Sequence, residues 1–183
     1  YIRFDVEQMG LGINKDIFLT SLKGEISIFQ PFKKKFYLAT TLKGKYSSPI
    51  NQPYFNQRGL GYDKEAISGY EQYVVDGQKY LLSKVNFKYK LFDWNVNLNN
   101  FPEKRFAKIP LMVYFKTYVD MGYVWDNRSS VYALGNIHYA NTYLPGGGFG
   151  LDFVTYYDFV IRVEYSVNRD MQSGVFINFK ATI

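Results

Sequence analysis

The sequence contains no cysteine and only one histidine, His138, and these two shortages exclude much of the usual chemistry of enzymes and metalloproteins. Without cysteine there is no disulfide framework, no thiol nucleophile and no cysteine-ligated metal. A single histidine excludes multi-histidine metal sites and the usual histidine-based triads. The sequence also has no G-x-S-x-G motif. We therefore expect no metal, no cofactor and no enzymatic activity, and we assign His138 an ordinary surface role.

Long apolar runs are missing as well. No segment approaches 18 consecutive apolar residues, so we expect no transmembrane helix. The chain starts at Tyr1 without a methionine or a signal peptide, in what its pattern indicates is the middle of a strand, and we expect further residues upstream. The glycine run 146–148 lacks the Lys-Ser/Thr and the helix of a phosphate loop, and we interpret it as the entry to a strand.

What the sequence does have is aromatic residues on a strict two-residue alternation. It holds 18 Tyr and 16 Phe, and such residues favour β structure. Apolar and polar positions alternate with the period of a strand. The alternating segments are 1–7, 17–29, 35–46, 81–91, 111–123, 146–154, 159–168 and 174–183. We predict an all-β chain of about eight strands, with a turn over 93–108 that includes Trp94 and Pro102.

Charge is sorted between the two faces of these segments. One face is apolar and aromatic, and the other holds the charged residues of a chain whose net charge is +6. The charged residues are Arg3, Asp5, Lys23, Glu25, Lys35, Lys43, Lys84, Lys88, Lys116, Asp120, Arg162, Glu164 and Lys180. A lysine or arginine facing the middle of a bilayer costs about 2–4 kcal/mol, so this separation is what a barrel with lipid outside and water inside requires.

Strand length also favours a barrel that spans a membrane. Most segments have about ten residues or more, which suits a tilted transmembrane strand, whereas strands of soluble domains average about five or six. Aromatic residues bracket the apolar bands as in interfacial girdles. They are Tyr46, Tyr80, Tyr89, Tyr123, Trp125, Tyr156 and Tyr157. We predict a transmembrane antiparallel β-barrel; the alternative is a soluble two-sheet sandwich with a charged exterior. The lysines would line an interior and no nucleic-acid-binding motif is visible, so we expect no nucleic-acid partner.

The connection over residues 51–79 is long and rich in tyrosine, glycine and apolar residues. Connections of that length without periodicity are usually functional or disordered, and this composition argues against disorder. An eight-stranded barrel has an interior only wide enough for its own side chains or one small ligand. We therefore expect residues 1–183 to form about eight C-terminal strands of a wider barrel, with the loop inserted into its lumen.

Several short runs have the order and spacing of a known family. One run lies within the long loop and consists of Ile67, Ser68, Gly69, Tyr70 and Glu71. It resembles the V-R-G-Y/F motif of the BamA/TamA outer-membrane assembly family, the bacterial surface-antigen barrels. The run 118–125, with Asp120 and Gly122, is similar to the family's aromatic-x-D-x-G strand. Residues 148–152, and residues 162–166 followed by 174–179, resemble its C-terminal strands.

This resemblance, which extends over nearly the whole chain, implies a fold and a function. It implies the C-terminal half of a sixteen-stranded barrel in the bacterial outer membrane, whose missing N-terminal part holds the other strands and periplasmic POTRA domains. It implies a factor that inserts unfolded outer-membrane proteins into the lipid bilayer, together with accessory lipoproteins or periplasmic subunits. The alternatives are the barrel module of a secretion or phospholipase-fusion protein, and a plain porin-like barrel.

The resemblance also implies a loop-latching contact. In the family, the arginine of the loop motif pairs with the aspartate of the D-x-G strand. Asp120 and Gly122 match that strand, but the arginine position is Ser68 here. A hydroxyl can donate a hydrogen bond to a carboxylate, and Arg58, ten residues earlier, can supply the charge instead. The alternative is that Asp120 is an ordinary interior charge neutralised by Lys116 or another lysine.

Finally, the resemblance implies a weakly paired seam at the last strand, where an incoming client strand pairs with the exposed edge. The alternative is simple closure of the barrel. The seam strand consists of Gly174, Val175, Phe176, Ile177, Asn178, Phe179, Lys180, Ala181, Thr182 and Ile183.

Overall fold

The computed structural model describes residues 1–10, 18–50, 52–62, 65–97, 108–127, 139–155 and 159–180. Within these ranges the chain forms a single antiparallel sheet of eight strands in chain order, β1 to β8. The strands are β1 (Ile2–Met9), β2 (Leu19–Pro31), β3 (Phe36–Ser48), β4 (Lys79–Asn97), β5 (Lys108–Trp125), β6 (Tyr143–Val154), β7 (Val160–Asn168) and β8 (Ser173–Lys180). One short 3-10 helix, η1 (Tyr54–Asn56), lies between β3 and β4.

The prediction of an all-β chain with eight strands is confirmed, but the predicted turn over 93–108 begins too early: β4 reaches Asn97 and β5 begins at Lys108, and residues 98–107 lie outside the described residues. The strands β4 and β5 continue into that segment as a hairpin, with 19 and 18 residues respectively. Their register shifts between Lys90 and Phe92, so a bulge interrupts the alternation where the sequence stops reading as a strand. Several predicted positions lie outside the described residues: Pro102, His138, Tyr156, Tyr157, Ala181, Thr182 and Ile183.

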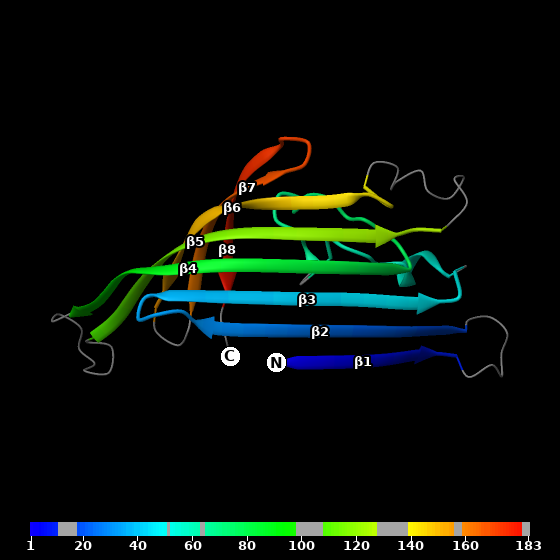
Figure 1. Cartoon of the computed structure of the whole chain (residues 1–183), viewed down its shortest axis with the longest axis horizontal. Coiled ribbons are helices and arrows are strands. Elements are labelled where there is room, and N and C mark those ends of the chain that lie inside the picture. The colour runs from blue at the N-terminus through cyan, green and yellow to red at the C-terminus, as the bar shows by residue number, and fades with distance from the viewer. Residues whose placement is uncertain are drawn as a thin grey trace.

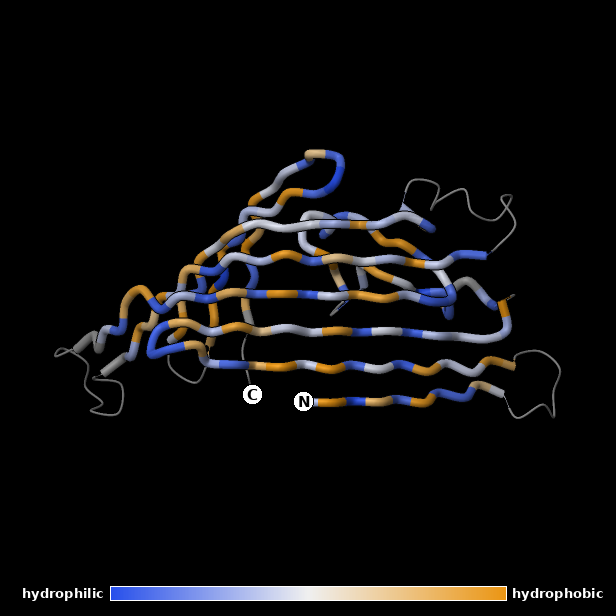
Figure 2. Tube along the Cα trace, viewed as in Figure 1, coloured by the Kyte–Doolittle hydropathy of each residue, from blue (hydrophilic) through white to orange (hydrophobic). Residues whose placement is uncertain are grey.

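The register confirms that the charged residues predicted for one face of the sheet lie together on that face, which also holds apolar residues such as Leu82 and Val124 near the loop. Asp5, Lys23 and Lys45 stand in one cross-strand row, for example, and Leu42, Ser83 and Met121 stand in another. The alternation is visible along the strands in Figure 2. We call the face with the charged residues the inner face and the apolar one the outer face. Val119 and Ile177, both on the outer face, are 60% and 59% exposed.

The sheet is curled and remains open. Figure 1 shows β1 to β6 lying side by side, with β7 and β8 running behind them. The described strands do not form the two packed sheets of the sandwich alternative. No helix among the described residues is long and apolar enough to span a membrane.

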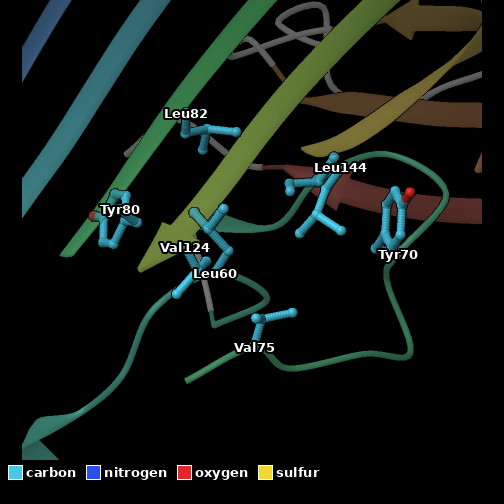
Figure 3. Packing of buried hydrophobic residues seen from close by; sticks show 8 residues of the cluster. Leu60, Tyr70, Val75, Tyr80, Leu82, Val124 and Leu144 are labelled. Atoms are coloured by element: carbon cyan, nitrogen blue, oxygen red, sulfur yellow. The ribbon is translucent and has the colours of Figure 1, made fainter. Parts of the chain in front are cut away.

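The apolar core lies between the inner face and the long loop that joins β3 to β4. Figure 3 shows Leu60 and Val75 of the loop beside Val124 of β5. An antiparallel bridge between Leu60 and Val75 holds the two arms of the loop together. Tyr80 belongs to this buried cluster and is 6% exposed, so its predicted place in an outer aromatic girdle is wrong. The loop is thus packed against one end of the inner face.

Candidate functional site

The carboxylate of Asp120 is the point where the loop is fixed to the sheet. Asp120 lies on the inner face of β5 and is only 1% exposed. One of its oxygens, Oδ2, accepts hydrogen bonds from the backbone N–H of Ser68 at 3.0 Å and from the Ser68 hydroxyl at 2.7 Å. The structure therefore brings together residues 67–71 of the loop and the Asp120–Gly122 strand, through the hydroxyl and the backbone of Ser68.

The cation beside Asp120 is Lys84, whose Nζ lies 3.3 Å from Oδ2. Lys84 is directly opposite Asp120 in the β4–β5 register, which the alternation alone does not reveal. Lys116 is four residues along the same strand, about 13 Å away, and it pairs with Glu164 instead. The guanidinium of Arg58 lies 5.5 Å from the ring centre of Tyr62. Arg58 thus does not take the place of the motif arginine, and a neighbouring lysine supplies the charge.

Gly122 provides the space that the loop needs. A Cβ on Gly122 would overlap the end of the Ile67 side chain and would lie 2.7 Å from Cδ1 of Leu60. Ile67 and Leu60 are both almost fully buried. The Asp-x-Gly spacing places the acceptor for Ser68 and the space for Ile67 on the same face of β5, two residues apart.

Two further glycines let the loop backbone approach the sheet closely. Gly69 has a φ of +84°, a conformation that other residues rarely adopt, and its Cα faces the backbone of Val167 in β7. A Cβ on Gly146 of β6 would overlap the carbonyl oxygen of Ser68. The motif therefore lies directly on β6 and β7, with no side chain between the two backbones.

Tyr70 and Glu71 extend the contact toward the turn between β7 and β8. The Tyr70 hydroxyl donates to the carbonyl of Pro145 at 3.2 Å and accepts from the backbone N–H of Arg169 at 3.1 Å. Burial raises the pKa of the Tyr70 phenol above its ordinary value. Glu71 accepts a hydrogen bond from the Ser166 hydroxyl at 3.2 Å. All five motif residues thus contact or closely approach the sheet.

Sequence reasoning missed the function of the glycines along the inner face of β6. Tyr118 of β5 reaches across Gly148 to the Ser166 hydroxyl of β7, at 2.8 Å. Lys116 reaches across Gly150 to Glu164 in the same way. The period-two alternation places these glycines on the inner face, but only the register shows which side chains cross them.

The predicted seam strand is described from Gly174 to Lys180, within β8. Among the described residues β8 pairs with β7 alone, so its other edge is not hydrogen-bonded to a strand. Val175, Ile177 and Phe179 are exposed on the outer face. On the inner face, Asn178 donates a hydrogen bond to Glu164 at 3.2 Å, which ties the strand to the charge network of Lys116.

In the part of the chain that the structure describes, no group of three or more His, Asp and Glu side chains is placed to hold a metal ion. Comparison of the chain with protein-family models, with curated proteins and with solved structures found no match.

Enlarging Gly146 should release the loop from the sheet. In Gly146→Val the new side chain would occupy the position of the Ser68 carbonyl, so residues 65–78 should lose their protection from hydrogen exchange while β2 to β5 keep theirs. Gly24→Val is the matched control, because a Cβ at Gly24 meets nothing within 4 Å. Unchanged exchange in the loop of the Gly146 variant would contradict this docking.

Removing the Ser68 hydroxyl should weaken the contact between the loop and the sheet without abolishing it. A hydrogen bond to a charged acceptor is worth about 1.5–3 kcal/mol, so Ser68→Ala should make local opening of the loop about tenfold to a hundredfold more frequent. The amide of Tyr70, which donates to the carbonyl of Ile67 at 3.1 Å, reports this opening through its exchange rate. Ser83→Ala, on the outer face of β4, should leave that rate unchanged.

Proposed function

We propose that this chain is the C-terminal part of an outer-membrane barrel of the BamA/TamA type, which inserts other outer-membrane proteins at the edge of its last strand. The observation that carries the proposal is the docking of residues 67–71 on the Asp120–Gly122 strand. The two runs that resemble the family's motifs are 52 residues apart at Ser68 and Asp120, and they meet in space through a direct hydrogen bond.

The outer face supports a membrane location. Large apolar side chains are exposed over every strand of that face, and a contiguous surface of this kind is rare on soluble monomers. Phe87, Phe149 and Tyr165 belong to one such cross-strand row. In the proposed setting these side chains contact lipid, and the charged inner face lines an aqueous lumen that the loop partly fills.

The last strand supports the insertion step. Among the described residues β8 is hydrogen-bonded to β7 alone, and the N–H and C=O groups of its other edge can pair with an extended client strand through main-chain hydrogen bonds. The loop steadies the turn that precedes this edge, since the Tyr73 hydroxyl donates to Gln172 at 2.9 Å and Asn168 donates to the same side chain at 3.0 Å. The proposal thus assigns the loop the task of holding the templating edge in place.

A charge on the outer face tests the membrane location. Val119→Lys should destabilise the protein in phosphatidylcholine vesicles by about 2–4 kcal/mol, because the ammonium group would face hydrocarbon. Asn86→Glu adds one charge to the inner face of the neighbouring strand, between Lys84 and Lys88, and should change stability little. Urea unfolding in vesicles measures both. If Val119→Lys proves as stable as the unchanged protein, the outer face does not contact lipid.

Cross-linking tests the proposed insertion edge directly. The absence of cysteine from these 183 residues means that a single introduced cysteine is the only thiol in this part of the protein. Ile177→Cys on β8 should form a disulfide with a cysteine in the terminal strand of a newly synthesised barrel protein. Val85→Cys is the control, since it also lies on the outer face but on a strand paired on both sides. Equal cross-linking of the two variants, or none at either, would contradict templating at β8.

A further inference from the structure

The end of the inner face away from the loop holds a pocket that neither the loop docking nor the proposed insertion step uses. It has a volume of about 610 Å³, and residues of β2 to β7 line it. This volume lies within the range of about 300–1,000 Å³ that is usual for small-molecule sites. Aromatic and aliphatic side chains form its walls, among them Phe29, Tyr37, Tyr114, Val154 and Val160.

The charged part of the lining consists of one carboxylate, Asp152, and two cations, Lys88 and Arg162. Asp152 is fully buried, and its carboxylate binds Nζ of Lys88 at 2.5 Å and Nε of Arg162 at 2.9 Å. Both cationic side chains remain 30% exposed. One carboxylate therefore pairs with two cations, and solvent or a ligand can still reach both of them.

The charged residues around this group do not neutralise its excess positive charge. Lys116 and Glu164 pair with each other behind Arg162, whose Nε lies 3.9 Å from Glu164. On the β4 side, Lys90 pairs with Asp93 at 2.9 Å. The two pairs are neutral, so the pocket keeps the one positive charge that Asp152 leaves uncompensated. An excess of positive charge next to a hollow favours an anionic occupant.

The apolar walls narrow the choice of anion. The rings of Tyr37 and Tyr114 stand edge to face, with centres 5.9 Å apart, in the same pocket as Lys88 and Arg162. The ring of Phe29, also in the lining, is 72% exposed. A fully hydrated ion would leave these surfaces uncovered, whereas a flat or aliphatic group would bury them.

We propose that this pocket binds a small amphipathic anion: a phosphate or carboxylate head on an aromatic or short hydrocarbon body. The head lies against Lys88 and Arg162, where charge-assisted hydrogen bonds hold it. The body lies between Phe29 and the Tyr37–Tyr114 pair. The site does not depend on the proposed insertion function, since it uses none of the residues of the loop motif or of β8.

Phenyl phosphate is the probe, because it is water-soluble and combines a phosphate head with an aromatic body. Calorimetric titration of the protein in a non-ionic detergent should show binding at least about tenfold tighter than that of either inorganic phosphate or phenol. Lys88→Gln keeps the ion pair between Arg162 and Asp152 and should lower the affinity for phenyl phosphate about tenfold or more. Ala39→Phe fills the pocket without touching the charges and should abolish binding.

The control is Lys23→Gln, which removes an inner-face lysine that pairs with Glu7 outside the pocket. It should bind phenyl phosphate like the unchanged protein. Equal affinity for inorganic phosphate and phenyl phosphate would show a bare anion site and overturn the proposal. So would unchanged affinity in both Lys88→Gln and Ala39→Phe, since the ligand would then bind elsewhere.

Discussion

A buried carboxylate has to be satisfied by hydrogen bonds or a counter-charge, and the placement of the loop depends on how Asp120 meets that demand. Its partners come from two separate segments: Ser68 of the loop donates twice, and Lys84 of β4 supplies the positive charge. If the loop left, Asp120 would lose both hydrogen bonds while the sheet around it stayed folded. The cost of that loss couples the loop to β4 and β5, so the loop behaves as a fixed part of the inner face rather than as a surface connection.

Small residues decide where this coupling is possible. Ser68 reaches Asp120 only because Gly122 leaves room for Ile67 and Gly146 leaves room for the loop backbone. Along the same face of β6, Gly148 lets Tyr118 reach Ser166 of β7. Side chains of β5 can thus contact partners two strands away, which a sheet with full-sized residues on β6 would prevent. These contacts across β6 join the loop, β5 and β7 into one network next to β8.

The sequence predicted the strands and their two faces well, because a period of two is a local property that a single chain displays. It failed where the period breaks: the bulge between Lys90 and Phe92 shifts the alternation by one residue, so residues 93–97, which belong to β4, were predicted as part of a turn. The meeting of Ser68 and Asp120 was expected from a resemblance and not from the alternation. The pairing of Asp120 with Lys84 could not be predicted, because it depends on the register between β4 and β5, which local patterns do not determine.

The inner face of β6 also explains why one end of the sheet is filled and the other is hollow. Along this strand the inward residues change from Leu144 through a row of glycines to Asp152 and Val154. Next to the glycines there is room for backbone, and the loop occupies it. At Asp152 a charged side chain replaces the glycine and draws Lys88 and Arg162 toward itself, and these stand in the way of a close-packed loop. The same strand therefore supports two different sites: one closed by the protein's own chain, and one whose charge and aromatic walls suit a molecule from outside.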